Sequence, residues 1–333
     1  MTTTDCAVAF SLVDLAIDPV AETDRIVEAI RDQVLRTLRR RGVVVGLSGG
    51  IDSTVTAALA VQALGPQRVL GLFMPERDSS GESLRLGDLL ARQLGIETVV
   101  EEISDTLEGA GCYARRDRAL QRLFPNFDSS CRWKIVLPSL FGKSPYRVFS
   151  AVMQDADGRV YQKRMPLEIY QEVLASTNFK QRVRKMMEYY HADRLHLAVA
   201  GTPNRLEYDQ GFFVKLGDGA ADLKPIAHLY KSQVYQLAEQ LEVPDEIIQR
   251  PPTTDTYSLE QTQEEFFFSL PYAEMDACLY GKDHAIPCQQ VASAISRTAE
   301  EVERVYHDID AKRRVAHYLH ERPLLIEPVD VQS

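Results

Sequence analysis

Cysteine is scarce in this sequence and never paired in spacing. The chain of 333 residues holds five cysteines, an odd number, and none of them forms a CxxC pair. They are Cys6, Cys112, Cys131, Cys278 and Cys288. This pattern excludes a zinc-ribbon type of site and predicts reduced thiols, with no disulfide framework.

Long apolar runs and an excess of basic residues are also missing. No stretch reaches the ~18 apolar residues of a membrane-spanning helix. The first residues, MTTTDCAVAFSLVDLAID, lack the basic start and continuous apolar core of a signal peptide. We therefore expect a cytoplasmic protein with no membrane partner. Lysine and arginine total 38 against 48 acidic residues, a net charge of −10, which argues against a nucleic-acid partner bound through its phosphates.

Strand-like and helix-like apolar patterns alternate along much of the chain. Strands are expected at 43–47, 68–74, 96–103 and 194–201, and helices at 21–41, 52–64, 81–94, 178–192 and within 270–320. Alternation at this spacing predicts βαβ units, which build an α/β fold with a doubly wound parallel sheet covered on both faces. We expect one principal domain over residues 1–333, closed by C-terminal helices at 270–320.

The alternating pattern breaks down over residues 105–176. This segment contains four prolines, the single Trp133 and a strand-turn-strand candidate centred on Asp157-Gly158, a hairpin-type pair. We expect an insertion or subdomain whose shape the sequence does not predict. Its basic stretch YARRDRALQRL either binds a substrate phosphate or covers an edge of the sheet.

The stretch VVVGLSGGIDST, residues 43–54, joins a buried strand to a helix through a small polar loop. Ligands of parallel α/β sheets collect at such junctions, where the helix presents unpaired N–H groups. Gly49 and Gly50 allow close backbone approach, and Ser48 and Ser53 add hydroxyl donors, so the loop is expected to hold phosphate. The alternative is an ordinary turn in which Asp52 caps the helix.

The loop is not a Walker motif, because GxxxxGK[ST] is absent and no lysine follows its glycines. A phosphate-binding loop without that lysine suits pyrophosphate as a leaving group. Asp52 is then positioned to help hold Mg²⁺ against the phosphate oxygens.

These residues resemble a known family. SGGIDS resembles the signature of the N-type ATP pyrophosphatases, which adenylate a substrate by splitting ATP between its α and β phosphates. Within that group, AGTPNRLEYDQGFFVKLGDGAADLKPIAHLYKSQV at 200–234 resembles the ammonia-dependent NAD synthetases, as do NFKQRVRKM, RPPTTD and SLPYAEMDACLYGKD. The resemblance covers about 21–104 and 176–320 and leaves the middle unmatched.

The resemblance implies the cofactors ATP and Mg²⁺ and a role for each matching residue. ATP would be bound by Ser48, Gly49, Gly50, Asp52, Ser53, Thr202, Lys231 and Thr253. The acid substrate would be bound by Arg182, Lys215, Asp218 and Asp222. Asp52 and Glu207 would hold the metal, and Asp52, Lys231 and Lys215 would be catalytic. Each assignment has an alternative. Glu207 could be a surface glutamate, Lys231 could be a solvated lysine at the start of a helix, and GDGAAD at 217–222 could be an ordinary turn.

The resemblance also implies the reaction and its partners. A carboxylate, deamido-NAD or a different acid, would be adenylated with release of pyrophosphate and then amidated by ammonia. A homodimer is expected, with free ammonia or a separate glutaminase as nitrogen source, because only about 40 residues precede the loop. The sequence departs from the family at Leu216, at Ala220 and at Phe266, Phe267 and Phe268. A nucleotide-binding protein without catalysis fits less well, because Asp52, Glu207, Lys215 and Lys231 are all present. A tRNA-modifying enzyme also fits less well, because the chain is acidic and shows no basic RNA-binding appendage.

Overall fold

The computed structural model describes residues 10–138, 140–141, 148–253, 257–259, 261–263 and 267–329. Its centre is a four-stranded sheet in the order β3-β2-β1-β7, and every neighbouring pair is parallel. The strands are β1 (Val43–Gly46), β2 (Val69–Phe73), β3 (Glu97–Val100) and β7 (Ala198–Ala200). The prediction of an α/β fold with a parallel sheet is confirmed.

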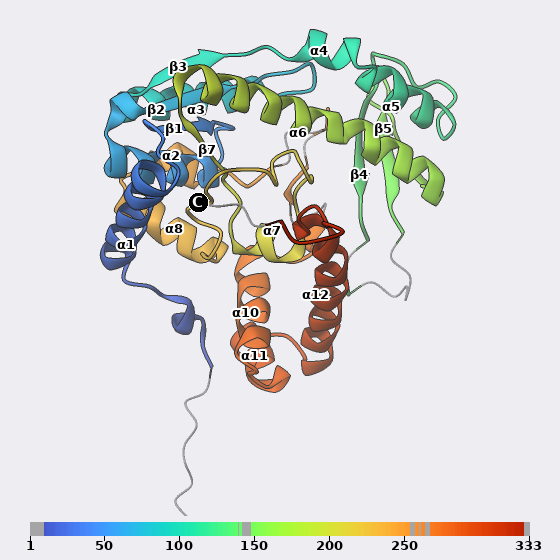
Figure 1. The fold of residues 1–333 in the computed structure, drawn as a ribbon. Coiled ribbons are helices and arrows are strands. Elements are labelled where there is room, and N and C mark those ends of the chain that lie inside the picture. The colour runs from blue at the N-terminus through green and yellow to red at the C-terminus, as the bar shows by residue number, and fades with distance from the viewer. Residues whose placement is uncertain are drawn as a thin grey trace, which may run out of the picture.

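Helices cover both faces of this sheet, as Figure 1 shows. Successive residues of β1 alternate between the faces: Val43 and Val45 join one core cluster and Val44 joins another. The first face packs against α1 (Pro19–Asp32), α2 (Ile51–Leu64), α3 (Gly81–Leu94) and α8 (Lys231–Gln240). The second packs against α4 (Ser104–Gly109), α5 (Cys112–Gln121) and α6 (Leu167–Leu195). The sheet is therefore doubly wound, as expected.

Two predicted boundaries were wrong around α6. This helix runs over 29 residues, so it begins well before the expected 178 and continues into the strand expected at 194–201. It ends where His196 adopts a left-handed φ of 60° and donates its N–H to the Ala192 carbonyl. Only Ala198–Ala200 remain for β7. The local sequence pattern did not predict either end of the helix, and element boundaries are the part of a prediction that is least certain. The helix expected at 21–41 likewise divides into α1 and a π-helical turn, Gln33–Thr37.

The segment 105–176 contains most of α4, all of α5, a second sheet and the start of α6. Its antiparallel strands, in the order β4-β5-β6, are Arg132–Val136, Ser150–Gln154 and Val160–Arg164. The hairpin expected at Asp157-Gly158 joins β5 to β6, with Gly158 at a φ of 82°. Trp133 belongs to β4, and its side chain is buried in the apolar core that this sheet forms with α5 and α6. The stretch YARRDRALQRL forms most of α5, which packs on α6 and on the central sheet.

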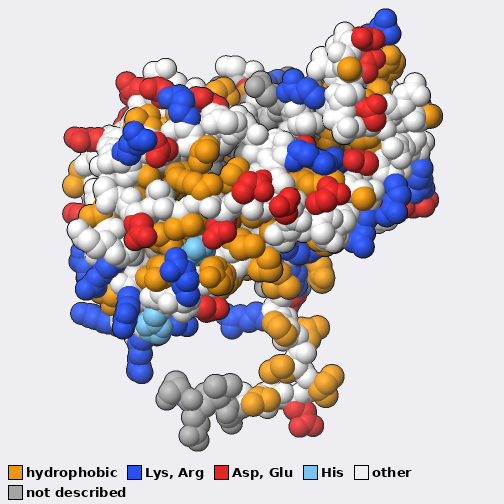
Figure 2. All heavy atoms as spheres, turned by 90° about the horizontal axis from the view of Figure 1, so that it is seen from above, with side chains coloured by type: hydrophobic (Ala, Val, Ile, Leu, Met, Phe, Trp, Pro, Cys, Tyr) orange, Lys and Arg blue, Asp and Glu red, His pale blue; other side chains and the backbone are white. Residues whose placement is uncertain are grey.

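The rest of the chain completes the scaffold around the first sheet. Short elements are Leu12–Leu15, Pro66–Arg68, α7 (Arg205–Gln210) and α9 (Asp245–Ile248). The C-terminal helices α10 (Tyr272–Asp283), α11 (Cys288–Ala294) and α12 (Ala299–His320) pack around a separate apolar core. Beyond α12, an arm with exposed Leu324, Leu325 and Ile326 stands off the body (Figure 2). Among the described helices, none combines the length and apolarity that crossing a bilayer requires.

A buried network of charges ties the loop after β2 to α5 and α6. Lys180 donates to Glu76 at 2.8 Å and to Asp78 at 2.6 Å, and its side chain is fully buried. Arg116 donates to Asp78 at 2.7 Å, and the Tyr113 hydroxyl donates to Glu76 at 2.8 Å. Removing one member of such a network leaves a charge in the interior without compensation.

Lys180→Met is therefore expected to lower the free energy of unfolding by ~3–5 kcal/mol, because Glu76 and Asp78 lose a shared buried cation. The measurement is urea unfolding followed by circular dichroism. Arg92→Met is the control: it removes a largely exposed pair with Asp88 and should cost about 1 kcal/mol or less. Equal losses in the two variants would contradict the assignment.

Candidate functional site

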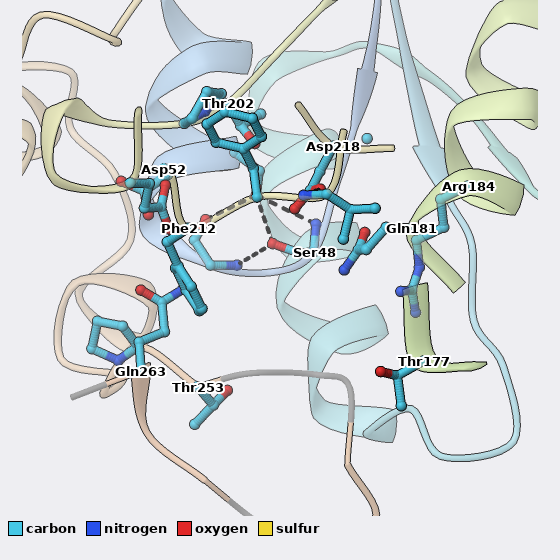
Figure 3. A pocket seen from close by; sticks show the side chains of 18 of the residues that line it. Ser48, Asp52, Thr177, Gln181, Arg184, Thr202, Phe212, Asp218, Thr253 and Gln263 are labelled. Carbon is cyan, nitrogen blue, oxygen red and sulfur yellow. Dashed lines mark hydrogen bonds between the residues drawn. The ribbon is translucent and has the colours of Figure 1, made fainter. Parts of the chain in front are cut away.

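A cavity of about 770 Å³ opens at the carboxyl ends of the central strands. The chain winds from β1 outward to β2 and β3 and then returns to β7 on the other side of β1. The carboxyl ends of β1 and β7 therefore meet at the point where the winding reverses, which is where open α/β sheets bind their ligands. Figure 3 shows Ser48 and Asp52, which follow β1, and Thr202, which follows β7, around the same cavity.

The loop after β1 is closed by its own serines. The Ser48 hydroxyl accepts from the Gly50 N–H at 3.3 Å and lies 3.1 Å from the Ser53 hydroxyl, which donates to the Gly50 carbonyl at 2.9 Å. Gly49 has a φ of 68°, and a Cβ there would lie 2.5 Å from the Ser83 carbonyl oxygen. No described side chain caps the N-terminus of α2. The start of α2 therefore presents backbone N–H groups of the kind that can hold an anion, and we call residues 48–53 the anion loop.

An ion pair lies beside this loop. Lys231, the first residue of α8, donates its Nζ to Asp52 Oδ2, and the lysine side chain is fully buried while that of Asp52 is 16% exposed. Asn204 Nδ2 donates to Asp52 Oδ1 at 3.2 Å. Asn204 also exchanges hydrogen bonds with Glu207 as a capping box at the start of α7. The first turns of α2, α7 and α8 thereby place Asp52, Glu207 and Lys231 in one cluster.

The protonation of this cluster follows from burial and mutual charge. Burial and the neighbouring Asp52 raise the pKa of Glu207 to about 8, although Lys231 acts in the opposite direction. Burial alone would lower the pKa of Lys231, but Asp52 and Glu207 outweigh it and raise the pKa above its usual value. Lys231 is therefore a fixed cation, and the cluster has room for further positive charge next to Glu207.

The two neighbouring carboxyl groups fit a magnesium site of the kind completed by phosphates, since a bound cation would favour the ionised form of Glu207. Mg²⁺ is usually held by one or two carboxylates together with phosphate oxygens and water. Asp52 and Glu207 supply such a pair beside the anion loop. Among the described residues no group of three or more His, Cys, Asp or Glu forms an all-protein cage, so the phosphates would have to complete the coordination.

The structure brings most of the predicted residues together. The cavity is lined by Ser48, Gly50, Asp52, Ser53, Arg182, Thr202, Glu207, Lys215, Asp218, Lys231 and Thr253. Gly49 is not among the lining residues. Its carbonyl accepts a hydrogen bond from the Arg250 guanidinium at 3.3 Å. Residues 254–256 and 264–266, which include part of the RPPTTD motif and Phe266, lie outside the described residues. Phe267 lines the cavity, and Phe268 is buried.

Two predicted substrate residues have partners within the protein. Asp222 is absent from the cavity lining and accepts from the Val199 N–H at 2.8 Å and the Tyr189 hydroxyl at 3.2 Å. Lys215 lines the cavity, but its Nζ donates to the carbonyls of Tyr318 at 2.7 Å and Glu321 at 3.0 Å. Their substrate roles stay predictions.

Sequence reasoning missed several residues of the cavity. Arg250 joins the anion loop to α3 by donating to Ser83 Oγ at 3.1 Å, and Arg184 donates to the Met74 carbonyl at 3.3 Å. Arg250 is the first residue of the quoted RPPTTD, and Asn204 lies within the quoted stretch at 200–234, so both could have been predicted from the motifs. Glu188 is buried against Gly46, and no sequence signal identified it.

Comparison with known proteins identifies relatives along almost the whole chain. The family described as NAD synthase matches residues 22–133 and 145–316. The NH(3)-dependent NAD(+) synthetase of Mesorhizobium japonicum is 58% identical over 93% of this chain and 98% of its own. The protein of the same name from Rhizobium meliloti is 56% identical over 96% of each. The family match also includes residues 105–133 and 145–176, a segment that the quoted motifs had left unmatched.

Solved structures show the same fold. An NMN synthetase from Francisella tularensis is 24% identical and superposes with a TM-score of 0.64 over 93% of this chain and 99% of its own. An NH3-dependent NAD synthetase from Campylobacter jejuni is 20% identical, with a TM-score of 0.60 over 93% and 100%. At these identities the likeness concerns the fold.

The raised pKa of Glu207 predicts how stability depends on pH. Between its ordinary pKa of 4.5 and about 8, the folded protein holds a proton that the unfolded chain releases, so rising pH lowers the free energy of unfolding. Glu207→Gln keeps the acceptor for the Asn204 N–H and removes the titration. From pH 5 to pH 8 the wild type should lose more stability than this variant, by at least ~1.4 kcal/mol, one pKa unit.

Urea unfolding of both proteins at several pH values, without ligand, checks this expectation. Parallel stability curves would show that Glu207 titrates near its ordinary pKa. Glu303→Gln, on the exposed side of α12, is the control and should leave the curve unchanged.

Proposed function

The chain belongs to the NAD synthase family, and we propose that the anion loop, the Asp52–Glu207 pair and Lys231 are its catalytic centre. The reaction is the ATP-dependent amidation of deamido-NAD by ammonia, which yields NAD, AMP and pyrophosphate. The observation that carries the proposal is the buried Lys231–Asp52 ion pair beside the preformed loop. It places a fixed cation and two carboxylates where the phosphates of ATP would lie.

The first step is formation of an acyl adenylate. An oxygen of the substrate carboxylate attacks the α-phosphorus of ATP, and the bond between that phosphorus and the bridging oxygen to the β-phosphate breaks. The backbone N–H groups at the start of α2 and the hydroxyls of Ser48 and Ser53 receive the departing pyrophosphate. Thr202, at the end of β7, and Thr253 line the cavity and contact the remaining nucleotide.

Lys231 stabilises the charge that grows around the α-phosphorus. Its ammonium is fully buried and oriented by Asp52, so it needs no reorganisation during the reaction. A fixed cation in a site that excludes water is worth most where negative charge develops in the transition state. Asp52 thereby has two roles, because it also faces the proposed metal position.

Asp52 and Glu207 are the residues that would hold Mg²⁺. When bound, the ion would neutralise phosphate oxygens and assist departure of pyrophosphate. The raised pKa of Glu207, caused by burial and Asp52, supports this assignment, because a cation would relieve the excess negative charge that raises it. The Asn204 N–H and side chain hold Glu207 and Asp52 in a fixed relation throughout.

The second step forms the amide. Ammonia attacks the carbonyl carbon of the adenylate, a carbon–nitrogen bond forms, and the carbon–oxygen bond to AMP breaks as nitrogen loses a proton. Arg182, Asp218 and Lys215 line the cavity and would position the acid, which makes effective concentration the main contribution of the protein. Asp222 would act through the strand end that it holds.

The partners are small molecules and a second copy of the chain. ATP, ammonia and deamido-NAD are the substrates, and we place the protein in a homodimer. Ammonia would come free from solution or from a separate glutaminase. Sedimentation velocity at assay concentrations measures the dimer directly, and a monomer active under the same conditions would refute that part of the proposal.

The proposed reaction is tested by counting its products. The protein is incubated with ATP, Mg²⁺, ammonium and deamido-NAD, and mass spectrometry should find NAD, AMP and pyrophosphate in equal amounts. Chelation of the metal with EDTA should stop all three. AMP and pyrophosphate without NAD would mean that ATP is used on a different acid, and ADP in place of AMP would contradict the site assignment.

Lys231→Met is expected to lower kcat by about 10²- to 10³-fold, because the growing charge at the α-phosphorus loses its fixed cation. Lys163→Met, on β6 and outside the cavity lining, is the control and should keep the wild-type kcat. The measurement is the steady-state rate of AMP release, with thermal unfolding to show that both variants fold. A kcat for Lys231→Met within tenfold of the wild type would remove Lys231 from the catalytic centre.

A further inference from the structure

A carboxylate that neither step of the reaction uses reaches the cavity from α6. Glu188 lines the cavity, and its side chain is only 9% exposed. Its Oε2 accepts a hydrogen bond from the buried Lys185 ammonium at 2.5 Å. Its Oε1 accepts no hydrogen bond from the part of the chain that the structure describes. Among the described residues, Oε1 is therefore left for a ligand in the cavity.

The backbone at the end of β1 leaves room for this oxygen. A Cβ at Gly46 would lie 3.2 Å from Glu188 Oε1 and 3.3 Å from the Met74 side chain, so a larger residue there would crowd the carboxylate. The anion loop begins two residues after Gly46. Because α6 covers one face of the central sheet and α8 covers the other, Glu188 approaches the anion loop from the face opposite to Lys231.

Charged groups on two elements surround the Glu188 carboxyl. Burial is the largest influence, and together with Asp218, in the loop after α7, it raises the pKa of Glu188 above its usual value. Lys185 and Arg184, on the same helix, act in the opposite direction and favour the ionised form. Asp218 lines the same cavity but accepts from the Val214 N–H at 2.7 Å, which holds it in its own loop. A carboxylate with a raised pKa is a stronger proton acceptor than an ordinary glutamate.

The Oε1 atom of Glu188 selects among the ligands of the reaction by charge. ATP and the acid substrate are anions, which a carboxylate repels. Mg²⁺ prefers several oxygen ligands, and the Lys185 ammonium beside Glu188 repels a divalent ion more strongly than a monovalent one. Ammonium is small, carries one positive charge and donates hydrogen bonds. It is therefore the substrate that suits a single carboxylate oxygen in this cavity.

We propose that Glu188 binds ammonium through Oε1 and removes one of its protons, so that neutral ammonia attacks the adenylate. This inference rests on the proposed function and assigns the proton acceptor of its second step. One N–H bond of ammonium breaks, the proton passes to Oε1, and the nitrogen keeps the electron pair. That pair forms the carbon–nitrogen bond, while the carbon–oxygen bond breaks and AMP takes its electrons. The amide nitrogen and Glu188 then each release one proton to water. Lys185 is the positioning residue, because it holds the other carboxylate oxygen.

The test is Glu188→Gln, which keeps an oxygen for Lys185 but takes no proton at neutral pH. At pH 7 the kcat/KM for ammonium should fall about 10²-fold, the size expected for a lost general base. The first step should be unaffected, so the exchange of labelled pyrophosphate into ATP, measured with deamido-NAD and without ammonium, should stay within twofold of the wild type. Asp193→Asn, an exposed change on the same helix outside the cavity lining, is the control and should alter neither rate.

Two readouts separate proton transfer from a structural effect. Raising the pH from 7 to 9 should remove most of the deficit of Glu188→Gln, because a larger share of the nitrogen then enters as neutral ammonia. Hydroxylamine, a weaker base than ammonia that is mostly neutral at pH 7, should react in this variant at close to the wild-type rate and give the hydroxamate. If the single variant unfolds because Lys185 loses its anion, the double variant with Lys185→Met removes that lysine and should show the same pattern.

Any of four results would overturn the proposal. They are an unchanged kcat/KM for ammonium, an equal loss of pyrophosphate exchange, a deficit that persists both at pH 9 and with hydroxylamine, and a weakened dependence on Mg²⁺, which would assign Glu188 to the metal. Failure of the proposed function is distinguishable from all of these, because it would appear as a lack of NAD formation by the unaltered protein.

Discussion

The site depends on one buried ion pair. Lys231 has no exposed surface, and an ammonium in that position is tolerable only because the Asp52 carboxylate accepts its hydrogen bond. The constraint extends outward, since Asp52 must follow the anion loop at the start of α2 and Lys231 must open α8. Asp276 on α10 accepts from the backbone N–H groups of Lys231 and Ser232, which fixes the start of that helix.

The same constraint affects the protonation of the cluster. Two carboxylates share one lysine, and Glu207 responds by holding its proton more tightly than an ordinary glutamate. A cation and phosphates would restore balance, because each would meet its opposite charge in a place that water reaches poorly. On the proposed assignment, binding of a cation would be linked to the protonation of Glu207, and adenylation would use a charge arrangement that the fold has already assembled.

The long helix α6 connects the two halves of the cavity. Near its C-terminus it packs on β1 and β7, and near its N-terminus it supports the second sheet. The buried network around Lys180 holds it to the loop after β2, so the helix has a fixed position relative to both sheets. The helix thereby sets the distance between the central sheet and the second sheet.

Much of the molecule follows from the sequence alone. The period of apolar residues determined that β1 and β2 are central parallel strands, and the glycines and serines of SGGIDS indicated an anion loop, because these are local properties of the backbone. The family resemblance also predicted roles for Asp52, Glu207 and Lys231, which the structure brings into one cluster. Tertiary structure decided the rest: the length of α6, the second partners of Lys215 and Asp222, the position of Arg250 and the stacking of Phe149 on Tyr170. All four features depend on contacts between residues that are distant in the sequence. Such contacts form only when packing brings the two groups together and removes them from water, so the local pattern does not predict them.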